Sequence, residues 1–202
     1  MIKDTPRDLT TIPIAPQMWN RFFTVSPLVL VGTKEESGEW DLAPKHMATP
    51  LGFFGYYAFV CTPDHATYWN AKREGVFTVS YPIPSQVVLA SLAAAPRAEG
   101  DEKPALAAIA TFPATRVDGV LVCDAYLYLE CELERIVDGF GANSLIVGRV
   151  VEAHAREDAL RSNERDDQEV IHQRPLLAYL YPGRYAPVES SNSFPFPDGM
   201  AR

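Results

Sequence analysis

Two short polar segments of this sequence carry side chains suited to holding an anionic ligand. In the first, Asp64, His65 and Thr67 stand at the start of a predicted short helix that Gly75 ends. The first turn of a helix has N–H groups without carbonyl partners, and a hydroxyl and an imidazole beside them add donors. The pattern predicts a phosphate-binding helix start. The alternative is a surface helix that Asp64 caps without any ligand.

The second polar segment, residues 41–50, has the sequence DLAPKHMATP. Lys45 and His46 could give a cation and a hydrogen-bond donor to a ligand with negative charge. Equally, Lys45 could be a solvated strand residue and His46 a hydrogen-bonded histidine inside a β-barrel. Ser80, at the end of a later apolar run, leaves a similar choice between a ligand contact and a hydrogen bond to the backbone.

Composition argues against several other classes of function. The 202 residues carry a net charge of −8, which disfavours nucleic acid or an anionic membrane as partner. No stretch has the ~20 apolar residues of a spanning helix, and the N-terminus lacks an apolar signal core, so we expect a cytoplasmic protein. Neither the three cysteines nor the four histidines have metal-ligand spacing, so no metal site is expected. Cys61 and Cys131 are expected in the core.

Short apolar and alternating runs predict a β-rich fold. We expect strands at residues 28–33, 40–43, 56–62, 76–81, 124–137 and 144–155. Besides the helix that ends at Gly75, we expect short helices at 17–23, 85–95, 105–114 and 164–172, and a charged loop at 97–104.

The stretch 124–137 alternates most regularly. Leucines and Cys131 fall on one face, and Tyr128, Glu130 and other tyrosines and glutamates fall on the other. This predicts an antiparallel sheet with one wet face. In the next strand, Gly148 predicts a bulge or a barrel bend.

The two ends of the chain read as appendages of one domain that spans 1–202. Residues 1–26 are expected to be an irregular lead-in, and 186–202 an extended tail, too rich in proline for regular structure. The whole is expected to be mainly β with peripheral helices, a barrel decorated by short helices.

Taken in order, residues 27–185 resemble the flavin reductase-like family, whose members bind FMN on a split β-barrel. The resemblance is carried above all by CTPDHATYWNAKREGVFTVSYP, in which Thr67 and Asn70 match the family's Thr-x-x-Asn at this helix. Ala43-Pro44 matches the segment that passes the flavin ring in the family. Residues 175–185 resemble its closing strand and glycine-bearing turn.

The resemblance implies which residues line an FMN site. Thr67 would hold the phosphate, the segment 41–50 would follow the polar edge of the flavin ring, and Tyr185 would line the pocket or the dimer contact. The implied FMN-binding residues are Lys45, His46, Met47, Ala48, Thr49, His65, Thr67, Asn70, Ser80 and Tyr185. No catalytic side chain is implied, because flavin accepts a hydride itself.

The family also implies an activity and an assembly. The implied protein is an NAD(P)H-dependent flavin reductase that uses NADH or NADPH and forms a homodimer with flavin near the subunit interface. The sequence lacks the Gly-x-Gly-x-x-Gly fingerprint, so the nucleotide would dock outside a Rossmann fold. Two alternatives stay open: an FMN-holding electron carrier or oxidase of the same fold, and a non-catalytic β-barrel module that binds another anion.

Overall fold

The structure is a computed structural model of the chain, and it describes residues 8–98, 103–162, 164–197 and 199. Residues 1–7 of the expected lead-in, 99–102 of the expected loop, and 198 and 200–202 of the expected tail lie outside the described residues.

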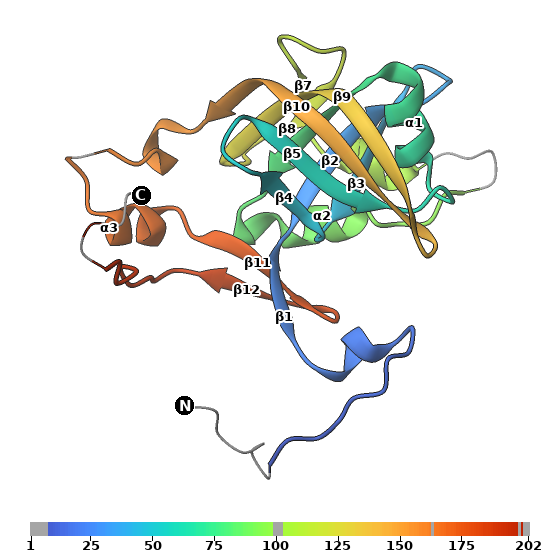
Figure 1. Cartoon of the computed structure of the whole chain (residues 1–202). Coiled ribbons are helices and arrows are strands. Elements are labelled where there is room, and N and C mark those ends of the chain that lie inside the picture. The colour runs from blue at the N-terminus through green and yellow to red at the C-terminus, as the bar shows by residue number, and fades with distance from the viewer. Residues whose placement is uncertain (1–7, 99–102, 163, 198, 200–202) are drawn as a thin grey trace.

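An antiparallel sheet of seven strands curls into a half-barrel and forms the main body of the molecule (Figure 1). Its strands, in spatial order, are β3 (Trp40–Lys45), β2 (Val29–Lys34), β6 (Val76–Tyr81), β9 (Leu127–Phe140), β10 (Asn143–Ala155), β5 (Tyr56–Cys61) and β4 (Ala48–Leu51). The mainly β character and the six predicted strands are confirmed. The sequence did not indicate β4, because it has only four residues and includes Pro50, which suits an edge strand.

A separate sheet of three strands lies beside the barrel (Figure 1). It consists of β1 (Thr24–Pro27), β11 (Leu176–Tyr181) and β12 (Arg184–Val188), with β11 in the centre. The predictions of an irregular lead-in and an irregular tail are therefore wrong at β1 and β12. Strand β1 forms because its backbone pairs with β11, more than 150 residues later, and β12 tolerates Pro187 because it is an edge strand.

The remaining elements are short and peripheral. They are the hairpin β7 (Thr111–Pro113) and β8 (Val120–Val122), the helices α1 (Ala66–Glu74), α2 (Val87–Leu92) and α3 (Asp167–Gln173), and the 3₁₀ turns η1 (Met18–Arg21), η2 (Pro84–Gln86), η3 (Pro104–Ala108) and η4 (Glu157–Ala159). The helix expected at 105–114 is only η3 followed by β7, so that prediction is wrong for its second half. Among the described residues, no helix is long and apolar enough to cross a membrane.

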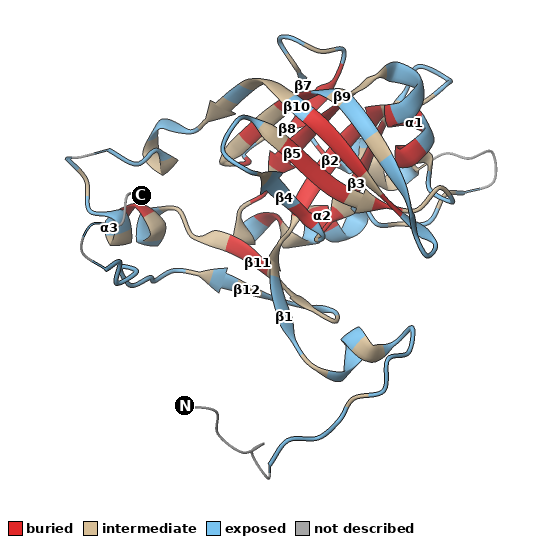
Figure 2. Cartoon of the chain, viewed as in Figure 1, coloured by how far each residue is buried: buried red, intermediate tan, exposed pale blue. Residues whose placement is uncertain are grey.

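The larger core fills the inside of the curled sheet (Figure 2). It contains Val29, Val31, Ala48, Tyr57, Phe59, Cys61, Tyr68, Ala71, Phe77, Val79, Cys131 and Ile146, so both predicted core cysteines are confirmed. The register of β9 against β10 shifts between Val147 and Gly148, which confirms the predicted bulge. A side chain at this glycine would not fit, because an added Cβ would lie 2.5 Å from the Phe77 ring.

A second, smaller core lies on the outer face of β2 and β3 and positions the segment after α2. Leu30 and Leu42 pack there against Ala90 and Ala93 of the α2 region and against Ile109. Strand β2 is thus buried on both faces, which explains its unbroken apolar run. The packing brings the chain that leaves α2 against β3.

The prediction of one wet face on β9 is wrong near its start. The hairpin β7–β8 covers this face, and the Phe112 ring packs edge-on against Tyr128 with ring centroids 5.3 Å apart. Tyr128 and Glu130 are consequently buried, whereas Glu132 and Glu134, beyond the hairpin, stay exposed as expected.

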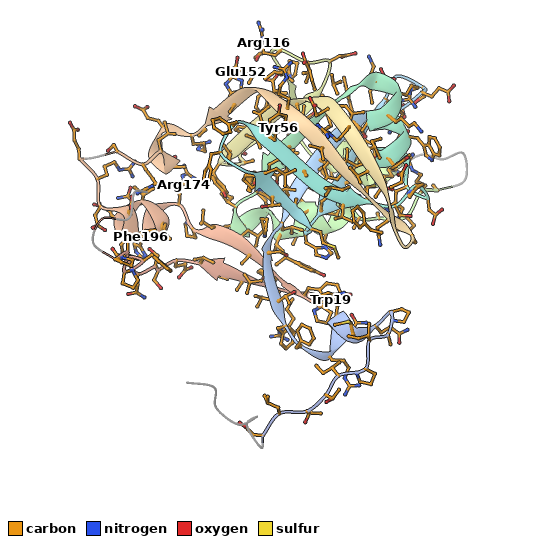
Figure 3. All side chains as sticks on the ribbon, viewed as in Figure 1. Trp19, Tyr56, Arg116, Glu152, Arg174 and Phe196 are labelled. Carbon is orange, nitrogen blue, oxygen red and sulfur yellow. The ribbon has the colours of Figure 1, made fainter. Side chains whose placement is uncertain are left out.

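The buried Glu130 carboxylate ties the loop between β7 and β8 to the barrel. The backbone N–H groups of Thr115, Arg116 and Val117 donate to it over 2.6–3.2 Å, and the Thr115 hydroxyl donates at 2.9 Å. Burial raises the pKa of Glu130, but these donors outweigh it and hold the pKa below its ordinary value. Arg116, which belongs to this loop, lies at the upper end of the barrel in Figure 3.

We predict that Glu130→Gln lowers the free energy of unfolding by roughly 2–3 kcal/mol, because an amide cannot accept all of these charge-assisted hydrogen bonds. This stabilisation is present above the unfolded-state pKa of about 4.3 and is lost as pH falls through the lower folded-state pKa. The free energy of unfolding of the variant should therefore depend less on pH in this acidic range. Urea unfolding between pH 3 and 7 measures both effects. Glu132→Gln, at an exposed ion pair with Arg149, is the control and changes stability by less than about 1 kcal/mol. Equal behaviour of the two variants would contradict the assigned role.

Candidate functional site

A cavity of about 330 Å³ lies between β3, the start of α1 and the segment that follows α2. Asp41, Ala43 and Lys45 of β3 reach it together, because side chains two apart on a strand share a face, and Pro44 also borders it. Its lining consists of Asp41, Ala43, Pro44, Lys45, Asp64, His65, Ala66, Thr67, Ala93, Ala94, Ala95, Pro96, Arg97 and Lys103. The lining thus unites the two polar segments that the sequence singled out.

The start of α1 presents donors to this cavity. His65 is the N-cap residue and makes no capping hydrogen bond with its side chain, while Asp64 bonds with Thr62 instead of capping the helix. The N–H groups of Ala66 and Thr67 belong to the first turn and have no acceptor within the helix. Gly75, in the left-handed conformation at φ 70°, ends the helix as predicted.

Lys45 brings a positive charge into the wall of the cavity. It is the last residue of β3, is largely buried, and its Nζ lies 3.5 Å from the Cys61 Sγ atom. Burial, and after it the Lys45 ammonium group, lower the pKa of His65 below its ordinary value. His65 is therefore neutral near pH 7 and can both donate and accept a hydrogen bond.

Sequence reasoning missed a charged cluster that joins β3 to the segment after α2. The buried Asp41 carboxylate has Lys103 Nζ at 2.8 Å and Arg97 Nη2 at 3.5 Å, and it accepts a hydrogen bond from the Thr67 hydroxyl at 3.5 Å. Lys103 also donates to the carbonyl oxygens of Leu42 and Ala93, at 3.3 Å each. Arg97 and Lys103 came from a stretch interpreted only as a charged loop, and no local pattern linked them to Asp41.

His46 lies on the other face of the sheet edge, not in the cavity. Its ring stacks on Tyr181 with centroids 5.3 Å apart and lies 4.8 Å from the Tyr179 ring. Burial, and then the charge on Lys45, lower its pKa below the ordinary value. Within the described part of the chain its Nε2 atom is buried without a hydrogen-bond partner.

Of the predicted FMN-binding residues near the turn from β3 to β4, two are exposed and one is buried. Met47 is exposed, and its carbonyl oxygen accepts a hydrogen bond from Val60 at 2.8 Å. Ala48 points into the barrel core. Thr49 is exposed, and its hydroxyl donates to the carbonyl of Pro50 at 3.3 Å.

Three further predicted site residues, like His46 and the residues of this turn, lie outside the cavity lining. Asn70 is buried and bonds with Thr33 at 3.3 Å, so it ties α1 to β2. The Ser80 hydroxyl accepts the N–H of Val122 at 3.0 Å, which matches the backbone alternative. Tyr185 is exposed on β12.

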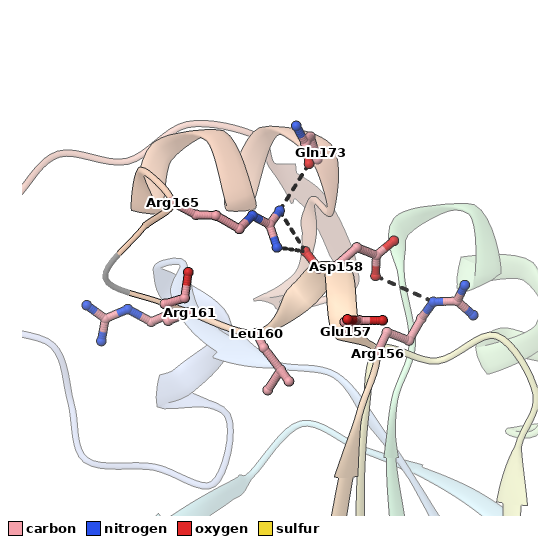
Figure 4. Close-up of a pocket in the computed structure, with 8 residues that line it drawn as sticks. Arg156, Glu157, Asp158, Leu160, Arg161, Arg165 and Gln173 are labelled. Carbon is pink, nitrogen blue, oxygen red and sulfur yellow. Dashed lines mark hydrogen bonds and ion pairs between the residues drawn. The ribbon is translucent and has the colours of Figure 1, made fainter.

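A larger cavity, of about 840 Å³, lies by η4 and α3, and its arginines already have protein partners (Figure 4). Arg161 makes a bidentate ion pair with Asp167, at 2.7 and 2.8 Å, and Arg165 donates to the Asp158 carbonyl and to Gln173. A new anion would have to displace these acceptors. Arg97 and Lys103 of the smaller cavity are paired as well, but that cavity adds the first-turn N–H groups of α1, which have no acceptor within the helix.

The donor set of the smaller cavity fits a phosphate monoester. Lys45, Arg97 and Lys103 supply positive charge, Thr67 supplies a hydroxyl, and the first turn of α1 supplies backbone N–H groups. Its volume is at the lower end of the range for small-molecule sites. This fit suits one end of a ligand whose remainder extends beyond the cavity.

Comparisons with known proteins identify the family and the fold. The sequence model of the flavin reductase like domain matches residues 21–189. Nitrilotriacetate monooxygenase component B from Bacillus cereus is similar in structure, with a TM-score of 0.75, 21% identity, and coverage of 97% of this chain and 98% of that one. Flavoredoxin of Desulfovibrio vulgaris (Miyazaki F) has a TM-score of 0.72 and 19% identity, with coverage of 98% and 100%. A protein with a split barrel domain from Shewanella frigidimarina NCIMB 400 has a TM-score of 0.73 and 16% identity, with coverage of 86% and 87%. The predicted split-barrel fold is confirmed.

We predict that Lys45→Met raises the pKa of the His65 ring, without restoring it fully because burial is the larger cause of its depression. NMR titration of the histidine ring signals measures this, with the His65 signal assigned by its loss in His65→Gln. Lys72→Met removes the same charge from the far end of α1, outside the cavity lining, and is expected to leave His65 unchanged. An unaltered His65 titration in Lys45→Met would contradict the described proximity.

Proposed function

The chain belongs to the flavin reductase-like family of oxidoreductases, and we propose that it uses FMN and reduces it with NADH or NADPH. The observation that carries this proposal is the convergence of the α1 first turn, Thr67 and three cations on one cavity. A flavin with a terminal phosphate has the anionic group that this donor set fits.

The phosphate of FMN would be held in the cavity. Lys45 supplies positive charge from β3 and Lys103 from the segment after α2, and the N–H groups of Ala66 and Thr67 supply directed hydrogen bonds. His65, neutral near pH 7, adds a donor or an acceptor according to its tautomer. None of these groups needs to transfer a proton during the reaction.

The ring system would extend from the cavity along the turn between β3 and β4. Two observations support this direction: His46 Nε2 is buried there with no hydrogen-bond partner among the described residues, and Met47 and Thr49 are exposed beside it. His46 would then hydrogen-bond to a polar edge of the ring while Tyr179 and Tyr181 fix its orientation.

The flavin, when bound, supplies the hydride and electron chemistry, whereas the protein supplies position and electrostatics. Lys45 would favour the reduced form of a nearby flavin, because a positive charge stabilises the negative charge gained on reduction. We assign no catalytic acid or base. The nicotinamide would reach the ring from its open side.

We further propose a homodimer whose interface includes the sheet of β1, β11 and β12. Apolar side chains are exposed along η1 and β1, among them Trp19, Phe23 and Val25. Trp19 lies on the part of the chain that extends away from the barrel (Figure 3). Burying these side chains against a second copy would remove apolar surface from water and would cover the open turn beside Met47.

A second candidate function is an electron carrier that holds FMN without rapid reduction by a pyridine nucleotide. The structural similarity to a flavoredoxin over nearly the full length of both chains supports this alternative. It shares the proposed binding site and differs only in the reductant.

We predict that the purified chain binds FMN and that NADH or NADPH bleaches the flavin absorption under anaerobic conditions. Thr67→Val is expected to weaken FMN binding roughly tenfold, because a hydroxyl hydrogen bond to a charged group contributes about 1.5–3 kcal/mol. Fluorescence quenching during an FMN titration measures the affinity, and stopped-flow absorbance measures the reduction.

Thr62→Val is the matched control for this prediction, because Thr62 precedes the same helix but does not line the cavity. It should bind FMN like the original chain. Flavin that binds but stays oxidised with both nucleotides would favour the carrier. A chain that binds no flavin would overturn the proposed function.

We also predict that Val25→Asp converts the proposed dimer to a monomer without unfolding the barrel. Val25 is 73% exposed on β1, and a charge there would be buried unpaired in the interface. Light scattering after size-exclusion chromatography measures the mass. Val88→Asp, on α2 at 65% exposure, is the control and should stay dimeric. A dimer in both variants would place the interface elsewhere.

A further inference from the structure

We infer that Asp41 is a specificity-determining residue whose carboxylate competes with the ligand phosphate, so that flavin exchanges rather than staying permanently bound. The inference rests on the proposed function and concerns the charged cluster around Asp41 in the same cavity. Asp41 is 2% exposed, and its carboxylate lies among the groups that a phosphate would use.

The competition follows from the contacts of Asp41. Lys103 Nζ lies 2.8 Å and Arg97 Nη2 3.5 Å from Oδ1, and the Thr67 hydroxyl donates to Oδ2 at 3.5 Å. A phosphate that binds Lys103 and the Thr67 hydroxyl must therefore share these donors with the Asp41 carboxylate or take them from it. Lys45 and the N–H groups of the α1 first turn, by contrast, make no hydrogen bond or ion pair with Asp41 within the described part of the chain.

Asp41 also keeps these donors in place without ligand. Lys103 is held by three oxygens, because it contacts Asp41 and donates to the carbonyls of Leu42 and Ala93. An unpaired cation buried in this position would be costly. The carboxylate therefore orders the cation while it lowers the free energy gained on phosphate binding.

The charges that line the cavity support the same conclusion. Lys45, Arg97 and Lys103 line the cavity with Asp41 and Asp64, and Glu35 pairs with Arg97 beside the lining, so these groups carry no net charge while His65 is neutral. A phosphate monoester carries about −1.5 to −2 charges near pH 7. Asp41 thus leaves the ligand charge uncompensated, and a neutral residue in its place would leave one net positive charge beside the phosphate.

The effect should be specific to the phosphate. Riboflavin has the same ring as FMN but no phosphate, so its binding should be nearly indifferent to the charge at Asp41. The geometry accordingly assigns Asp41 control over the preference for FMN relative to riboflavin, and not over recognition of the ring.

The test measures the dissociation constants of FMN and riboflavin for the full chain and for Asp41→Asn, by flavin fluorescence at low salt. We expect Asp41→Asn to bind FMN about tenfold more tightly and to release it more slowly, because a like charge next to the phosphate is removed. Riboflavin affinity should change less than about twofold. The gain for FMN should shrink as salt screens the charges.

Two further variants keep the result interpretable. Lys103→Met should weaken FMN binding without changing riboflavin binding, since it removes the cation that Asp41 and the phosphate share. Glu36→Gln removes one negative charge from the exposed turn after β2, outside the cavity lining, and controls for net charge alone. It should leave both affinities unchanged.

Weaker or unchanged FMN binding in Asp41→Asn, while the original chain binds FMN, would overturn this inference and leave the proposed function intact. Equal tightening of FMN and riboflavin would also overturn it, because the effect would not concern the phosphate. If Asp41→Asn fails to fold, unchanged FMN affinity in Lys103→Met overturns the inference by itself. A chain that binds neither flavin would refute the proposed function instead.

Discussion

The buried ion cluster around Asp41 is the interaction on which the site depends. It joins β3 to the first turn of α1 through Thr67, and to the segment after α2 through Lys103 and Arg97. Charged groups are costly to bury unless they are paired. The cluster therefore fixes the positions of these three parts of the chain relative to each other. The cavity is the space that remains between them.

The split barrel supplies the frame for this cluster. Strand β2 is buried on both faces. Helix α1 packs on its inner face, and the α2 region packs on its outer face together with Leu42 of the neighbouring β3. Inside, the core of aromatic and β-branched residues fixes the curl of the sheet, and the bulge at Gly148 allows the Phe77 ring to pack closely. Rigid walls of this kind keep the donors of an anion site oriented before the ligand arrives.

The sequence allowed the strands to be predicted because their periodicity is local, and it allowed α1 to be predicted from Thr67 and from Gly75 at its end. It could not show β1, whose pairing with β11 joins opposite ends of the chain. The burial of Glu130 was missed for a related reason, since an alternating pattern predicts a wet face unless another hairpin covers it. Of the proposed site, Lys45, His65 and Thr67 were found from residue type. Asp41, Arg97 and Lys103 were not, because only the packing of α2 against β3 brings them together.

The central claim is that the cavity beside β3 holds the phosphate of FMN. Backbone amide NMR of the full chain during an FMN titration tests it most directly, with the signals of Ala66 and Thr67 assigned. The account predicts that these first-turn amides shift most strongly with FMN and far less with riboflavin. Shifts concentrated instead around Arg161 and Arg165, in the larger cavity by α3, would contradict it.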